Sequence, residues 1–128
     1  MLVVEDEALL ALDLEVRLRR HGWQVLGPVA TVAQALRLLD GAGRALPEVA
    51  LLDANLRGEP ATPVAERLRA VGVPFVMSSA YDGARLVALG LGEAPALGKP
   101  ASDRALLAAL ARAKGPERPP AARGADHP

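Results

Sequence analysis

The chain has 128 residues, 51 % of them hydrophobic, which suffices for one domain with a sizeable core but not for two ordinary domains. Lys and Arg together number 15, as do Asp and Glu, so no overall charge favours binding to nucleic acid or to an anionic membrane. The absence of cysteine excludes disulfides, thiolate zinc sites and cysteine nucleophiles. An aromatic content of 2 % disfavours a stacking platform for single-stranded nucleic acid.

Apolar runs alternate with helix-like segments along the chain. The apolar runs predict strands, over residues 2–4, 23–26, 49–53, 73–78 and 95–98. The segments between and after them predict helices, over residues 7–21, 31–40, 62–71, 84–90 and 102–113. Thr31, the pair Thr62–Pro63 and the pair Ser102–Asp103 mark three of the helix starts. This alternation predicts an α/β fold: a doubly wound five-stranded parallel sheet with helices on both faces.

The remaining segments are expected to be loops or tail. Residues 54–60 and 79–83 are expected loops. Residues 115–128 are dominated by Pro, Gly and charge without periodicity, so we predict a domain over 1–114 and a disordered Pro/Gly-rich tail over 115–128. His127 lies in this tail and His21 at a helix end, and neither position favours catalysis.

Neither a membrane span nor a secretory leader is recognisable in the sequence. No stretch is apolar over the length that a bilayer requires, and the N-terminus lacks the basic region and cleavage site of a signal peptide. We therefore expect a cytoplasmic protein, which the absence of cysteine also suits.

Four apolar runs end in residues able to do chemistry. They read LVVEDE, VALLD, FVMSS and ALGKP. In open α/β sheets, ligands bind beyond the carboxyl ends of the strands, so Glu5, Asp6, Asp53, Ser79 and Lys99 are expected to share one site. Helix-start acids, a turn aspartate and a surface lysine would each explain one of these residues. They would not explain why every such group follows a strand.

Three carboxylates in one cavity repel each other and raise each other's pKa values. A divalent cation removes this conflict, and oxygen ligands suit Mg²⁺, so we expect magnesium at Glu5, Asp6 and Asp53. We also expect the Lys99–Pro100 bond to be cis, because X-Pro bonds are where cis peptides occur and a cis bond would aim the lysine back over the sheet edge.

Several enzyme classes lack their signatures. No histidine is placed to activate a serine, and the sequence has neither GxGxxG nor GxxxxGK[ST], which disfavours hydrolase triads, dinucleotide sites and P-loops.

The motifs VVEDE, LLDANLRG, SSAYD and GKP, in this order and spacing, resemble the receiver domain of two-component response regulators over residues 2–113. The resemblance implies that Asp53 is the phosphoacceptor. It implies a magnesium site at Glu5, Asp6 (a direct ligand), Asp53 and the Asn55 carbonyl. Ser79, Ala80 and Lys99 would bind the phosphoryl group and switch.

The resemblance also implies partners and a mode of action. The phosphoryl donor would be a histidine kinase or a histidine phosphotransfer protein. The chain itself would not bind nucleic acid directly and would not insert into a membrane. Formation of a homodimer is compatible with the resemblance. The chain would phosphorylate and dephosphorylate only itself, and so would not be a conventional enzyme. It would switch partner interactions or serve as a phosphate shuttle or sink.

Two departures from the family concern switching. The family usually has Phe or Tyr three residues before the lysine, where this chain has Ala96, and Tyr81 is the nearest aromatic that could substitute. Ser79 stands where threonine is commoner. A degenerate receiver that only binds proteins is one alternative, which Ala96 favours slightly and the intact acidic set disfavours. Another is a haloacid-dehalogenase-like phosphatase, which usually has a second aspartate where this chain has Asn55.

The first helix has two apolar stripes. Leu10, Leu14 and Leu18 form the stripe that we assign to the core, and Leu9, Leu12 and Val16 form the other, on nearly the opposite side. The second stripe either packs against the last helix or stays exposed and docks a histidine-bearing helical partner.

Overall fold

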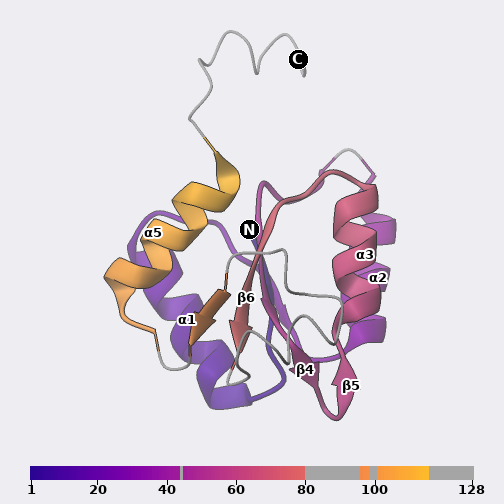
Figure 1. Ribbon diagram of the computed structural model, residues 1–128, viewed down its shortest axis with the longest axis horizontal. Coiled ribbons are helices and arrows are strands. Elements are labelled where there is room, and N and C mark those ends of the chain that lie inside the picture. Colours follow the sequence, from indigo (N-terminus) through magenta and orange to yellow (C-terminus); the bar gives the residue numbers. More distant parts are fainter. Residues whose placement is uncertain (44, 80–95, 99–100, 116–128) are drawn as a thin grey trace, which may run out of the picture.

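The computed structural model describes residues 1–43, 45–79, 96–98 and 101–115, and its centre is a parallel sheet (Figure 1). Its strands are β1 (Leu2–Val4), β2 (Leu26–Val29), β3 (Ala50–Asp53), β6 (Phe75–Ser79) and β7 (Ala96–Gly98). Their order across the sheet is β2-β1-β3-β6-β7, and every neighbouring pair is parallel. The first strand thus lies inside the sheet and the chain winds outward in both directions, which confirms the predicted doubly wound fold.

Helices cover both faces of this sheet. They are α1 (Ala8–Arg20), α2 (Val32–Gly41), α3 (Thr62–Ala70) and α5 (Asp103–Lys114). Figure 1 shows α1 and α5 on one side of the sheet and α2 and α3 on the other. The expected helix over 84–90 and the tail from residue 116 lie outside the described residues. Among the helices that are described, none has the length and apolarity needed to cross a membrane.

The strands are buried on both faces, which explains their nearly continuous apolar sequences. In β1, Leu2 and Val4 belong to the cluster under α2 and α3, whereas Val3 between them belongs to the cluster under α1 and α5. In β3, Leu51 and Leu52 divide in the same way. Because successive side chains of a strand point to opposite faces, two helix layers require this unbroken hydrophobicity.

Two of the three predicted helix starts are confirmed in detail. The Thr31 hydroxyl accepts a hydrogen bond from the Gln34 amide at 3.1 Å, and the Ser102 hydroxyl accepts one from the Ala105 amide at 3.1 Å. At α3 the predicted start is also found, since the helix begins at Thr62 with Pro63 in its first turn; Ala61 occupies the capping position and makes no side-chain hydrogen bond there.

The second strand was predicted too early in the chain. We expected residues 23–26, but β2 spans Leu26–Val29 and includes Pro28. Its ladder with β1 runs from the bond of the Leu26 amide to the Met1 carbonyl as far as the bond of the Glu5 amide to the Val29 carbonyl. Because β2 is an edge strand, a proline without an N–H does not break the sheet.

Gly27 is required at the centre of β2. Its φ of +88° is disfavoured for other residues, and a Cβ there would lie 2.7 Å from the Val29 nitrogen and 3.1 Å from the Val3 carbonyl oxygen. We expect Gly27→Ala to lower the free energy of unfolding by about 1–3 kcal/mol, measured by urea denaturation. Gly41→Ala is the matched control, since a Cβ at Gly41 meets nothing within 4 Å. Equal stability of the two variants would contradict this prediction.

The segment expected as a loop over 54–60 contains a small hairpin. Strands β4 (Asn55–Leu56) and β5 (Glu59–Pro60) pair antiparallel through a two-residue turn. The turn residues, Arg57 and Gly58, have φ angles of 55° and 86°. Positive φ at both positions is what a tight hairpin turn requires. The hairpin lies at the end of the sheet toward which the strands point (Figure 1).

Candidate functional site

Three carboxylates meet at the carboxyl ends of β1 and β3. These strands are neighbours in register, with Val4 opposite Leu52, so the residues that follow each strand are brought side by side. Glu5, Asp6 and Asp53 each contribute an oxygen, and these oxygens all lie within 4.8 Å of one another. Glu5 is only 3 % exposed and Asp53 only 7 %. The structure therefore brings together the three acids that the sequence predicted to share a site.

Backbone amides hold these carboxylates in place. The Glu7 amide donates to Glu5 Oε2 at 3.1 Å, the Asn55 amide to Asp53 Oδ1 at 3.3 Å and the Arg57 amide to Asp6 Oδ2 at 3.0 Å. The Asn55 side chain in turn accepts from the Gly58 amide at 3.0 Å. The β4–β5 hairpin is thus tied to the acidic cluster at two points, which fixes the orientation of Asp6 and Asp53.

The environment of Asp6 favours its charged form. Partial burial is the largest single influence and raises the pKa of Asp6, but it is outweighed by hydrogen bonds from the Arg57 amide and with Asp53 and Glu5, so that the net pKa lies below the usual value. Because Asp6 keeps its negative charge beside two buried carboxyl groups, a cation is favoured at the same place.

The donor set fits Mg²⁺. The three donors are hard carboxylate oxygens, and magnesium in proteins is bound through few carboxylates and retains several waters. Asn55 lies beside the cluster, in bonding contact with Asp53 through its amide. The acids present could therefore hold the expected metal.

The end of β6 borders this cluster. Asp53 pairs across the ladder with Ser78, and Ser79 pairs with Gly98 at the end of β7. Ser78 is buried. Ser79, expected at the start of a loop, is the last residue of the strand instead, because the ladder between β6 and β7 extends to it.

Several predicted site residues lie outside the described residues. They are Ala80, Tyr81, Lys99 and Pro100. The expected cis bond at Lys99–Pro100 stays a prediction, and the cis peptide that the structure does describe is Gly27–Pro28.

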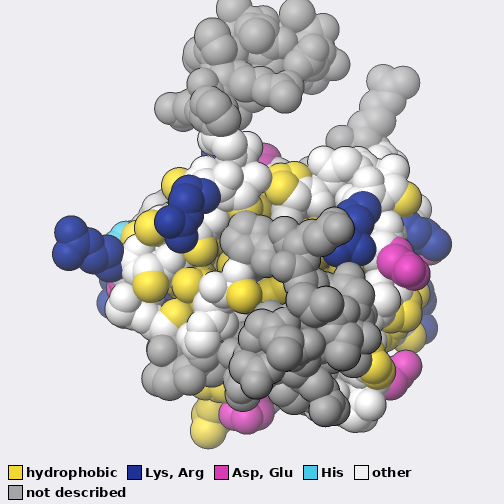
Figure 2. Space-filling model, in the orientation of Figure 1, with side chains coloured by type: hydrophobic (Ala, Val, Ile, Leu, Met, Phe, Trp, Pro, Cys, Tyr) yellow, Lys and Arg dark blue, Asp and Glu magenta, His cyan; other side chains and the backbone are white. Residues whose placement is uncertain are grey.

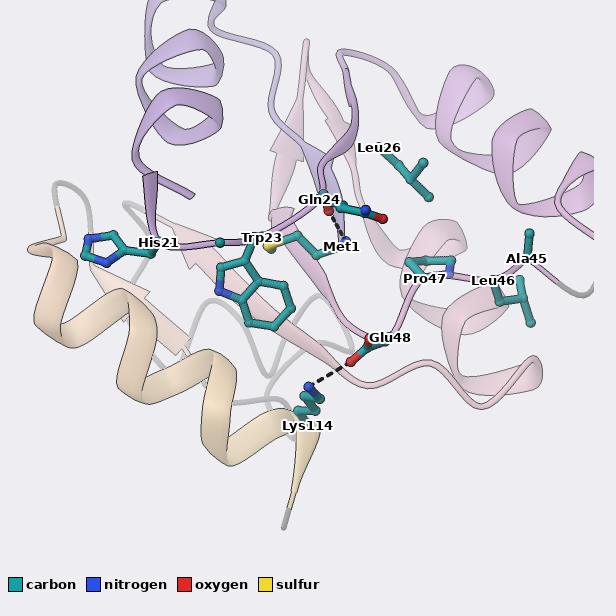
Figure 3. A pocket seen from close by; sticks show the side chains of 11 residues that line it. Met1, His21, Trp23, Gln24, Leu26, Ala45, Leu46, Pro47, Glu48 and Lys114 are labelled. Atoms are coloured by element: carbon teal, nitrogen blue, oxygen red, sulfur yellow. Dashed lines mark hydrogen bonds and ion pairs between the residues drawn. The ribbon is translucent and has the colours of Figure 1, made fainter. Parts of the chain in front are cut away.

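A cavity of about 290 Å³ opens beside the cluster, between α1 and α5. Glu5 and Ser78 form its wall on the sheet side, and Leu10, Arg17 and Ala101 are among the residues on its other walls. A larger hollow, of about 620 Å³, lies near the amino ends of the strands, around Trp23 (Figure 3). Lys114 and Glu48 form an ion pair there at 2.8 Å, and Glu48 is the one carboxylate side chain among the described residues that line this hollow.

The outer face of α1 is exposed, as one of the two interpretations predicted. Leu9 is 81 % exposed, Leu12 56 % and Val16 47 %, so the alternative that they pack against the last helix is wrong. Of the stripe assigned to the core, Leu18 is fully buried, while Leu14 is half-buried and Leu10 lines the cavity beside the cluster.

Charge on the described surface is mixed. In Figure 2, Lys and Arg side chains stand apart from one another around the visible face, with Asp and Glu among them. Among the described residues visible there, the basic side chains form no continuous surface of the kind that tracks a nucleic-acid backbone.

Sequence reasoning missed two arginines near the site. The Arg57 amide bonds Asp6, and its signal was the Arg-Gly pair in a segment taken for a loop. Arg17 links α1 to the start of α5 through Asp103. Its signal was weaker: an aspartate four residues earlier, Asp13, indicates only a pair within the helix.

Comparisons with known proteins gave matches among solved structures. No family model matches the sequence, and no curated protein matches it. A response regulator receiver protein from Burkholderia phymatum matches with a TM-score of 0.77 and 26 % identity, over 92 % of this chain and 96 % of that one. The receiver domain of a sensor histidine kinase from Pseudomonas aeruginosa, with magnesium coordinated in its active-site cleft, matches with a TM-score of 0.74 and 29 % identity, over 90 % and 96 %.

A third solved structure shows the same fold in a phosphorylated state. It is a response regulator from Burkholderia pseudomallei with a phosphorylated aspartic acid and a calcium ion. It matches with a TM-score of 0.73 and 26 % identity, over 88 % of this chain and 66 % of that one.

A doubly wound parallel sheet with three carboxylates at its carboxyl end defines a receiver-like α/β protein. The chain has the fold of a response regulator receiver domain, and the resemblance indicated by its motifs is confirmed. This fold supports a phosphoacceptor role in two-component signalling.

Proposed function

We propose that this chain is a response-regulator receiver that accepts a phosphoryl group on Asp53 from a phosphohistidine of a partner protein, with Mg²⁺ bound. The observation that carries the proposal is the cluster itself. Glu5, Asp6 and Asp53 lie within 4.8 Å of one another at the carboxyl end of the sheet, in a receiver fold.

The proposed step is an in-line transfer. An oxygen of the Asp53 carboxylate attacks phosphorus, the bond from phosphorus to the donor nitrogen breaks, and the donor histidine leaves with its electron pair and takes up a proton. When bound at Glu5, Asp6, Asp53 and the Asn55 carbonyl, Mg²⁺ supplies positive charge to the phosphoryl oxygens, which arrive with roughly two negative charges. Catalysis here is mostly positioning and electrostatics, and the amides of Asn55 and Arg57 already hold Asp53 and Asp6.

Lys99, Ser79 and Ala80 would complete the phosphoryl site. The Lys99 ammonium, a compact point charge, pairs with one phosphoryl oxygen, and the Ser79 hydroxyl donates to another. A shift of Ser79 toward these oxygens when the phosphoryl charge arrives would give a two-state switch. Since Ala96 cannot provide the usual aromatic, the nearest candidate for that part of the switch is Tyr81.

The output would be a change in partner binding, or storage and relay of the phosphoryl group. The donor would be a histidine kinase or a histidine phosphotransfer protein in the cytoplasm. Attack of water on the acyl phosphate returns the chain to its starting state, so it would turn over its own modification and no other substrate. We propose no direct nucleic-acid partner.

The test uses a small-molecule donor. The chain is incubated with acetyl phosphate and MgCl₂, and its intact mass is measured over time. The expected result is a gain of one phosphoryl group that EDTA prevents. A chain that gains no mass with magnesium present would refute the proposal.

The exposed stripe on α1 is the proposed docking surface for the phosphodonor, because it begins beside the Asp53 cluster and stays uncovered. We expect Leu9→Gln with Val16→Gln to slow transfer from the phosphohistidine partner about ten-fold, the equivalent of about 1.4 kcal/mol. The rate with acetyl phosphate and the thermal midpoint should not change.

Val71→Gln is the matched control for that pair, since Val71 is an apolar residue that is 37 % exposed and directly follows α3. It should leave transfer from the partner unchanged. Equal losses of stability and of both reactions in the α1 variant would show that the substitutions disturb the fold, and would refute the docking proposal.

A further inference from the structure

One largely buried arginine contacts Ala101 and Asp103, at the start of α5. The Arg17 side chain, in α1, is only 17 % exposed, yet it has three acceptors. Its Nε donates to Asp103 Oδ1 at 2.5 Å, one terminal nitrogen to the Ala101 carbonyl at 2.6 Å and the other to Asp13 Oδ2 at 3.1 Å. A planar guanidinium can serve several acceptors at once in a fixed geometry, which a lysine cannot.

Two of these acceptors belong to the segment that follows β7. Ala101 lies in the connection and Asp103 is the first residue of α5. The other end of the connection is fixed where Gly98 pairs with Ser79 in the sheet. Lys99 stands in the sequence between these two anchored points, two residues before Ala101.

The contacts of Arg17 are stronger than those of an isolated ion pair on the surface. The pKa of Arg17 lies above its usual value: burial, the largest single influence, lowers it, but the hydrogen bonds and charges of Asp103 and Asp13 outweigh burial. Asp103 has a second partner, His21, whose Nε2 lies 3.3 Å from its Oδ2. By contrast, Arg19, two residues on, is 51 % exposed and its charge partner is Glu15 within the same helix.

We propose that Arg17 is a positioning residue for phosphoryl transfer, acting through the β7–α5 connection to set the place of Lys99. This proposal rests on the proposed function, since it assigns Arg17 a role in that same site. No contact described for Arg17 involves Glu5, Asp6 or Asp53, so its effect on the reaction should not pass through the metal.

The competing explanation is that Arg17 only ties α1 to α5 and thereby stabilises the fold. A double-mutant cycle separates the two, because residues acting through one another are not additive whereas independent ones are. The four proteins are the wild type, Arg17→Gln, Lys99→Ala and the double variant. The measured quantity is the initial rate of mass gain with acetyl phosphate and MgCl₂.

We expect Arg17→Gln to slow phosphorylation of the wild type on the order of ten-fold, because small misplacements of a positioned group cost up to about 10²-fold. In the Lys99→Ala background it should have no further effect. The affinity for Mg²⁺, measured by calorimetry, should equal that of the wild type. Arg17→Lys and Asp103→Asn, which keep part of the network, should give intermediate rates, and Arg19→Gln is the control that should match the wild type.

The same fold-reduction by Arg17→Gln in both backgrounds would overturn this proposal and leave the proposed function intact. So would a wild-type rate in Arg17→Gln. Should Arg17→Gln not fold, the same cycle is run with Asp103→Asn, and the same criteria apply. A wild-type chain that gains no phosphoryl group would overturn the proposed function, and this proposal with it.

Discussion

Asp53→Asn is expected to abolish the mass gain from acetyl phosphate completely. The amide oxygen of asparagine is a far weaker nucleophile than a carboxylate, so no acyl phosphate forms. The change is nearly isosteric, and its Oδ1 can still accept the hydrogen bond from the Asn55 amide. Because one of three mutually repelling charges is removed, the thermal midpoint without metal should be no lower than that of the wild type.

Asp40→Asn is the matched control for this variant. Asp40 is an aspartate on α2 that is 54 % exposed and pairs with Arg67, away from the acidic cluster. It should gain the phosphoryl group at the wild-type rate. Phosphorylation that persists in Asp53→Asn, mapped by peptide mass spectrometry to another residue, would show that the acceptor is misassigned.

The fold was predictable because its strands are buried on both faces. Apolar runs such as VALLD are typical of strands buried on both faces, and glycines and capping residues separate these runs from the helices. The prediction of the second strand failed because apolar content alone did not identify that strand. Trp23 and Val25 look like strand residues, but Trp23 packs in the cluster under α1 and α5, with Lys114 5.5 Å from its ring centre.

The pairing partner of that strand could not be read from its own residues. Its ladder continues through Gly27 and Pro28, which local preferences place in a turn. The edge position of β2 makes this tolerable, and edge position is a property of the whole sheet. Similarly, the hairpin after β3 requires Arg57 at a positive φ, which is uncommon for arginine and so was not expected.

The site was predictable as a set of residue types at strand ends, but its internal support was not. Parallel pairing of β1 and β3 places Glu5, Asp6 and Asp53 together almost automatically. The amides that orient them belong to backbone groups of residues 55 and 57, and backbone donors leave little trace in a sequence. The Arg17 network joins residues more than 80 positions apart, which only the tertiary fold brings together.

The second large effect is expected at Asp6, which we propose as a direct Mg²⁺ ligand. Asp6→Asn removes one charge from a donor set of three, and its affinity for Mg²⁺ should fall at least about ten-fold, or about 1.4 kcal/mol. The amide Oδ1 can still accept the hydrogen bond from Arg57, so the hairpin should stay in place. Calorimetric titration with MgCl₂ measures the affinity directly.

Stability measurements give an independent reading of the same change. A ligand present at about 100 times its dissociation constant stabilises a protein by about 2.7 kcal/mol, so urea denaturation of the wild type should shift with MgCl₂ at such concentrations. In Asp6→Asn the shift at the same concentration should be much smaller. In EDTA the variant should be at least as stable as the wild type, because repulsion with Glu5 and Asp53 is relieved.

Glu7→Gln, which changes a neighbouring exposed acid outside the cluster, should behave like the wild type in both measurements. An Asp6→Asn protein that binds Mg²⁺ as tightly as the wild type would remove Asp6 from the ligand set.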